Sequence, residues 1–199
     1  MSFKVQLVSL GNAVDSATQA SCTTALKKYF DDVVAEYDSK YVGKGSKFVD
    51  SDVSWVSSLS NVGATDIVIY FVKYSSDSVA KDFNSAVNGS GNGVTFPTTG
   101  SPVVSEVYAT NAAGKTDVGA ALAALAFHES MHNKLRMDDA TLHGLNGRNG
   151  AGSGLSSDPI SATYALTAPE KTEMAKHLND KVAQWTGGID AWSNPSNGH

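Results

Sequence analysis

The chain has 199 residues, of which 41% are hydrophobic and 18% charged, a size that suits one globular domain with a sizeable core. Its formal net charge of −5 argues against binding to nucleic acid or to an anionic membrane surface, because both need a basic face. Its single cysteine excludes an internal disulfide, and its longest apolar run, residues 118–127, reaches about half the length of a membrane span.

The N-terminal part of the chain predicts a strand followed by a long helix. Residues 3–10 mostly alternate between apolar and polar side chains, as a half-buried strand does. The helix that follows is expected to be capped near Asp15 or Ser16. Its apolar side chains recur at helical spacing on one stripe: Cys22, Leu26, Phe30, Val33, Val34 and Tyr37. Cys22 is therefore expected to be a small core side chain.

The middle of the chain predicts further strands. A short one is expected at residues 47–49, and the strongest covers residues 66–72, whose near-continuous apolar run is typical of a strand buried on both faces. The polar stretch 75–99 is interpreted as a long surface loop that carries one short helix at most. Residues 102–109 alternate again and predict an edge strand, with a proline tolerated at its start.

Two more helices are predicted in the second half. Residues 116–135 form the first, with Thr116 as its N-cap. This helix is apolar all round over residues 118–127, which indicates a central, buried position, and Gly119 allows close packing. The last helix starts near Thr167, which forms a capping box with Glu170, and it runs to about residue 185.

The central helix carries the motif His128-Glu129-Ser130-Met131-His132, the HExxH pattern. Residues four apart lie on one helix face, so His128 and His132 can bind the same metal ion. Glu129 is offset by about 100° around the helix axis and can reach a metal-bound water without being a ligand. The pattern therefore predicts a zinc site in which Glu129 is the general base of a hydrolase.

The order of the elements and the HExxH pattern resemble the metzincins, a group of zinc metallopeptidases within the zincins. The resemblance implies an α+β fold with a mixed twisted sheet, a long helix packed on it, a central HExxH helix and a C-terminal helix. It also implies that substrate lies extended along the edge strand, here residues 103–109. The sequence departs from the metzincin pattern at Leu135, where the family has a glycine.

A methionine turn beneath the metal is a further metzincin feature. Residues 158–167 match its position but contain no methionine, and Ile160 or a neighbouring side chain is expected to fill that space. In some metzincins a tyrosine just past this turn helps to hold the metal or the oxyanion. Tyr164 is placed for such a role.

A catalytic zinc ion usually has three protein ligands, and the third one here has several candidates. His143 is favoured, because three histidines are a recognised catalytic set and Gly144 can supply a turn after it. Asp138, which keeps the metzincin spacing, and Asp139 are the alternatives. A different zincin arrangement would use a downstream glutamate, for which only Glu170 and Glu173 are available; the capping box explains Glu170 better.

These observations predict one catalytic domain over residues 1–199, with an N-terminal lobe at 1–135 and a smaller lobe at 136–199. The expected function is that of a monomeric zinc-dependent endopeptidase, a hydrolase that acts on peptide or protein substrates with Zn²⁺ as its cofactor. Two alternatives stay open, a non-catalytic zinc-binding module with the same fold and a zinc hydrolase of non-peptide amides. The sequence is compatible with a secreted protein that lacks disulfides and with a cytoplasmic one.

Overall fold

A computed structural model describes residues 3–41, 51–57, 67–79, 93–96, 104–134 and 165–186. In chain order its elements are β1 (Phe3–Ser9), η1 (Leu10–Asn12), α1 (Ser16–Tyr41), β2 (Ser51–Trp55), β3 (Ile67–Val72), η2 (Ser75–Asp77), β4 (Gly93–Phe96), β5 (Val104–Tyr108), η3 (Ala109–Ala112), α3 (Val118–Lys134) and α5 (Ala168–Thr186). The residue ranges 135–164 and 187–199 lie outside this description.

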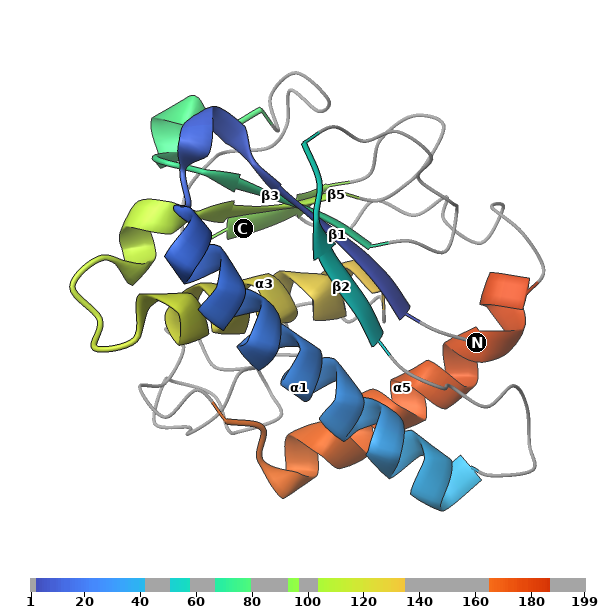
Figure 1. Cartoon of the computed structure of the whole chain (residues 1–199). Coiled ribbons are helices and arrows are strands. Elements are labelled where there is room, and N and C mark those ends of the chain that lie inside the picture. The colour runs from blue at the N-terminus through green and yellow to red at the C-terminus, as the bar shows by residue number, and fades with distance from the viewer. Residues whose placement is uncertain are drawn as a thin grey trace.

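The five described strands form one mixed sheet with the order β2-β1-β3-β5-β4. Strands β2, β1, β3 and β5 are parallel, and β4 runs antiparallel to β5. Figure 1 shows the sheet together with the helices α1, α3 and α5. The α+β class is therefore confirmed at this level, with a mixed sheet and the helices α1, α3 and α5 among the described residues.

One row of residues crosses the whole sheet and shows which face the helices cover. The paired positions are Trp55, Leu7, Ile69, Ser105 and Thr95, one from each strand. Side chains at paired positions point to the same face. At one end Trp55 donates its indole N–H to Thr23 on α1 over 2.9 Å, and at the other end Ser105 and Thr95 contact α3. Helices α1 and α3 therefore pack on the same face of the sheet.

The core lies between this face and the two helices. Strand β3 is buried at five of its six positions, as its apolar run predicts. The stripe expected on α1 is buried as well, with Tyr29 added to it. Phe127 of α3 packs edge to face against Tyr29 and Phe30 of α1, with ring centroids 5.5 and 5.2 Å apart. These contacts hold α3 against α1 on this face of the sheet.

Gly119 lets α1 and α3 approach closely near the start of α3. A Cβ atom at this position would overlap Ser21 Oγ and would lie 2.7 Å from Ser21 Cβ and 3.0 Å from the backbone nitrogen of Cys22. The side chain that glycine lacks would therefore collide with α1. The close packing expected from Gly119 is confirmed.

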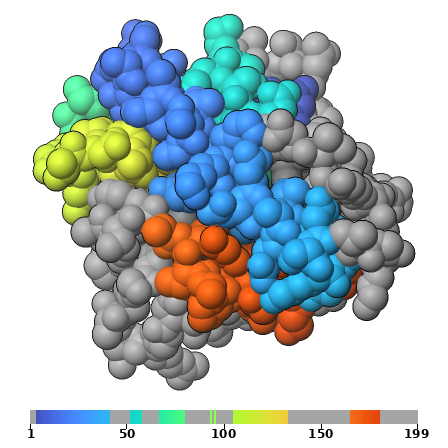
Figure 2. All heavy atoms as spheres, turned by 60° about the horizontal axis from the view of Figure 1, so that its bottom comes forward, coloured from blue at the N-terminus to red at the C-terminus, as the bar shows by residue number. Residues whose placement is uncertain are grey.

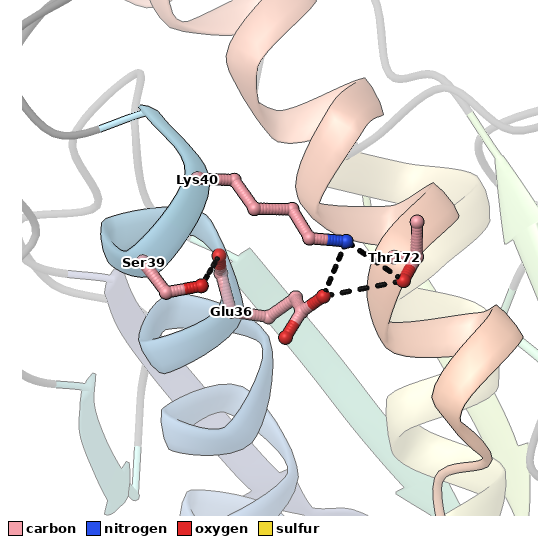
Figure 3. Close-up of polar contacts among 4 residues, drawn as sticks. All are labelled: Glu36, Ser39, Lys40 and Thr172. Atoms are coloured by element: carbon pink, nitrogen blue, oxygen red, sulfur yellow. Dashed lines mark hydrogen bonds and ion pairs between the residues drawn. The ribbon is translucent and has the colours of Figure 1, made fainter.

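Helix α5 lies beside α1 on its side away from the sheet, and Figure 2 shows the two helices side by side on one face of the molecule. Lys40 donates to Thr172 Oγ1 over 3.0 Å, and Thr172 donates to Glu36 over 3.2 Å (Figure 3). Thr167 and Glu170 form the predicted capping box, in which the Thr167 N–H donates to Glu170 Oε2 over 2.6 Å. The last helix therefore begins where the sequence predicts.

Two predictions about the sheet edge are wrong. Residues 102–109 were expected to form an edge strand, but β5 lies between β3 and β4. The stretch 75–99 was interpreted as a loop, yet it contains β4, which is the end strand among the described ones. Four residues in an Asn-, Gly- and Ser-rich stretch carry too short a pattern to predict a strand, and β4 forms because β5 and α3 both pack against it.

Two smaller predictions concern a strand and a cap. The strand predicted at residues 47–49 lies outside the described residues and stays a prediction, and a strand that was not predicted, β2, covers Ser51–Trp55. The N-cap of α3 is Asp117 rather than Thr116, because Asp117 Oδ1 accepts the N–H of Ala120 over 2.9 Å. In the described part of the chain we find no helix with the length and hydropathy required to cross a membrane.

Candidate metal site

The HExxH residues lie on the last turns of α3, beyond its apolar first half. His128, Glu129 and His132 are 8%, 5% and 2% exposed. Burying ionisable side chains costs free energy unless they gain partners, so three of them in five residues require an explanation. The prediction that the motif lies on a buried helix is confirmed.

The two histidine rings turn their Nε2 atoms toward each other. These atoms lie 3.3 Å apart, and the ring planes are inclined at 72°. Two nitrogen ligands about 2.0–2.1 Å from a tetrahedral zinc ion lie roughly 3.3–3.4 Å from each other. The pair therefore has the separation that zinc requires. One N–H···N hydrogen bond between two neutral rings fits the same separation, so the distance suits a metal-free pair as well.

Glu129 faces the end strand β4. Thr95 donates to its carboxylate oxygen Oε2 over 2.8 Å, and the other oxygen, Oε1, lies beside the backbone of Gly93. A Cβ atom at Gly93 would be only 2.9 Å from Oε1. The carboxylate therefore occupies space that exists because residue 93 has no side chain.

The candidates for a third ligand lie outside the described residues. Among the described residues, no further His, Cys, Asp or Glu joins His128 and His132 in a group that could hold a metal ion. His143, Asp138, Asp139 and Tyr164 all fall in the range 135–164, as does Leu135. The choice between His143 and the two aspartates stays a prediction.

The two glutamates of α5 do not join the histidine pair. Glu170 is fully buried and bonds to the N-terminus of its own helix, as the capping box requires. Glu173 forms an ion pair with Lys176 at 2.9 Å on the same helix. Neither belongs to a three-residue metal group in the described part of the chain. The described structure therefore does not bring either glutamate together with the histidine pair.

Another buried carboxylate, that of Glu106 on β5, lies on the other face of the sheet. It neighbours Ser105 on β5, and successive strand residues point to opposite faces. Its Oε2 accepts the N–H of Val79 over 2.9 Å. Burial, and then the negative charge of Glu106, raise the pKa of Tyr108 to about 12, so this phenol stays neutral. Glu106 is therefore separated from the histidines by the sheet.

Sequence reasoning missed the polar residues beneath Glu129. Thr95 and Ser105 face α3, and Gly93 makes room for the carboxylate. Thr95 and Gly93 belong to the strand that was interpreted as a loop. Ser105 carries a weak signal, since it is a small polar residue in an otherwise strand-like run.

Comparison of the chain with models of known protein families gives no match, and a search of the curated proteins finds no similar sequence. The function therefore has to be inferred from the residues and their geometry.

Proposed function

We propose that this chain is a zinc-dependent endopeptidase with the metzincin-like fold. The observation that carries the proposal is the Nε2–Nε2 separation of 3.3 Å between His128 and His132, with Glu129 buried on the adjacent face of the same helix. The strand order, with one antiparallel strand at the end of an otherwise parallel sheet, supports it.

In this proposal His128 and His132 supply two zinc ligands through Nε2, and His143 is the favoured third. A bound zinc ion would polarise the scissile carbonyl and lower the pKa of its water to about 7. Glu129 accepts a proton from the attacking water and then delivers it to the leaving amine. Its burial at 5% exposure keeps bulk water from competing for that carboxylate.

The strand order changes which strand we propose for the substrate, from β5 to β4. Strand β4 is last in the order of the described strands, and it lies next to Glu129. A peptide that pairs with its outer edge would extend the sheet by one strand and pass the end of α3. We therefore propose β4, rather than residues 103–109, as the strand that holds the substrate.

The test compares cleavage of a mixed, fluorescence-quenched peptide library by the zinc-loaded chain and by Glu129→Gln. The variant should lose at least about 100-fold in kcat/KM while it retains zinc, because general base catalysis contributes 10² to 10⁴. Glu36→Gln is the matched control, since it makes the same change on α1 and is expected to keep full activity. Equal cleavage by Glu129→Gln would contradict the proposal.

The same assay separates the alternatives. Stoichiometric zinc without cleavage of any peptide would favour the non-catalytic zinc-binding module. Cleavage of simple amides or esters, but not peptides, would favour the non-peptide hydrolase.

A further inference from the structure

The row of paired residues that crosses the sheet ends in polar side chains, which lie directly beneath Glu129. The row is apolar at Leu7 and Ile69 and changes to hydroxyl side chains at Ser105 and Thr95. Both hydroxyl residues are buried, at 0% and 2% exposure. A buried hydroxyl needs a hydrogen-bond partner, and the partner both of them share is Glu129.

Thr95 makes the closest contacts. Its Oγ1 lies 2.8 Å from Glu129 Oε2, 2.9 Å from the Glu129 backbone oxygen and 2.9 Å from Ser105 Oγ. Ser105 Oγ in turn lies 3.3 Å from the same backbone oxygen. Thr95 therefore contacts both the main chain and the carboxylate of Glu129.

The number of hydroxyl hydrogens shows which atoms donate and which accept among Thr95, Ser105 and Glu129. Each hydroxyl has one hydrogen to donate. An ionised carboxylate is a stronger acceptor than a neutral carbonyl or hydroxyl, so Thr95 donates to Oε2. Ser105 then donates to the Glu129 backbone oxygen or to Thr95 Oγ1. Ser105 thus supports Thr95, and Thr95 acts on the carboxylate.

Gly93 bounds the carboxylate on its other side. Glycine has no Cβ atom, and a Cβ atom at position 93 would lie only 2.9 Å from Glu129 Oε1. The carboxylate is thereby held between the backbone of β4 at Gly93 and the hydroxyl of Thr95 on the same strand. A glutamate with three side-chain torsions would otherwise sample several orientations, at a cost in entropy when it reacts.

We propose that Thr95 is a positioning residue that fixes the orientation of the Glu129 carboxylate through its hydroxyl. The inference rests on the proposed function, because it assigns Glu129 the role of general base. It assigns Thr95 no contact with substrate or metal. It also links the strand proposed to hold the substrate to the base that acts on it.

The first test measures kcat and KM for Thr95→Val, which removes the hydroxyl at nearly constant volume. We expect kcat to fall roughly 10- to 100-fold, since misplacing a catalytic group by about 1 Å has an effect of that size. KM should stay within about twofold and zinc content should not change. Thr95→Ser keeps the hydroxyl and should retain kcat within about threefold.

A partly buried threonine elsewhere controls for the loss of a hydroxyl that is hydrogen-bonded inside the fold. Thr23→Val removes a hydroxyl that accepts from Trp55 Nε1 over 2.9 Å on α1, away from the site. This variant should lose stability without losing kcat. Thr95→Ala is a second variant in case valine does not fold, and it should behave as Thr95→Val does. Unchanged kcat in both Thr95 variants, or equal losses in Thr95→Ser and Thr95→Val, would overturn the inference.

A second test needs no activity. Urea unfolding midpoints of the full chain are measured for Thr95→Val, Glu129→Ala and the double variant. A direct bond predicts that Thr95→Val lowers the midpoint less when Glu129 is already alanine. Additive shifts would contradict the bond. If Glu129→Gln retained activity, the proposed function would fail; if only Thr95→Val did, the positioning role alone would fail.

Discussion

At the residue scale, the buried ionisable groups on α3 are what require a functional explanation. His128, Glu129 and His132 follow a helix segment whose side chains are almost wholly apolar. A purely structural helix would gain more by placing apolar residues at these positions, because buried polar groups stabilise little even when satisfied. Their presence is explained if the histidines hold a metal ion and Glu129 acts on a water beside it.

A second prediction at the residue scale is that the buried thiol of Cys22 is unreactive and takes no part in the proposed zinc chemistry. Burial raises the pKa of its thiol to about 12, well above the ordinary value of a cysteine. The thiolate is the reactive form, so the folded chain should not react with a thiol reagent at pH 8. Reaction should become rapid in denaturing urea, and absorbance of the released dye measures both rates.

The raised pKa of Cys22 also predicts how the stability of the fold changes with pH. Between the two pKa values the unfolded thiol loses its proton while the folded thiol keeps it, so stability falls as pH rises above about 9. Cys22→Ala should remove this component of the pH dependence. Fast labelling of the folded chain at pH 8 would contradict the buried position of Cys22.

The histidine pair on α3 could be predicted from the sequence, but the polar residues that contact Glu129 could not. Spacing alone places His128 and His132 on one helix face, since that relation is local. Thr95 and Glu129 are 34 residues apart in the chain, and the packing of α3 on β4 and β5 brings them together. Long-range contacts of this kind leave no periodic trace in the sequence.

At the scale of elements, the fold depends on how closely α3 approaches α1. Gly119 permits this approach, and Phe127 fills the space further along the same interface. The position of the HExxH turns relative to β4 follows from this packing, because α3 is a continuous helix from Val118 to Lys134. A shift at one end of the helix is therefore expected to move the other.

Gly119→Ala tests this dependence. Alanine favours helix formation by about 1 kcal/mol over glycine, but its Cβ would lie 2.7 Å from Ser21 Cβ and 3.0 Å from a backbone nitrogen. We expect a net destabilisation of about 1–3 kcal/mol, the usual cost of overpacking, measured by urea unfolding.

Gly119→Ala combined with Ser21→Gly is the matched control. Removing the Ser21 side chain relieves the two shortest contacts and should restore part of the lost stability. A stabilised Gly119→Ala variant would show that helix propensity outweighs the packing, contrary to the close approach described above.

Element prediction succeeded where the pattern was long and regular. Helices α1, α3 and α5 and strand β3 all lie where the sequence predicts them, within a few residues. Strand β4 was missed because its four residues lie in a polar stretch and are stabilised by neighbours rather than by their own propensity. The cap of α3 was misplaced by one residue, since Thr116 and Asp117 are both good N-caps.

At the scale of the whole molecule, binding of zinc should stabilise the fold. The two histidines proposed as ligands belong to the helix at the centre of the core, so the folded state would bind the ion better than the unfolded chain. Free zinc at about 100 times its Kd should add roughly 2.7 kcal/mol, or a Tm increase of several degrees.

Differential scanning calorimetry with and without a chelator measures this effect. His132→Ala should show the same Tm in both conditions, because it lacks one ligand. His177→Ala, on α5, is the control and should keep the zinc-dependent increase. An equal zinc response in His132→Ala and the parent chain would place the metal elsewhere.

The most direct test of the central claim is the anomalous scattering at the zinc edge from crystals of the chain grown with one equivalent of zinc. We predict one strong peak about 2.0–2.1 Å from the Nε2 atoms of both His128 and His132, with a third ligand from residues 138–143. A peak at a site remote from these two nitrogens, or zinc-loaded crystals with no peak between them, would contradict the account.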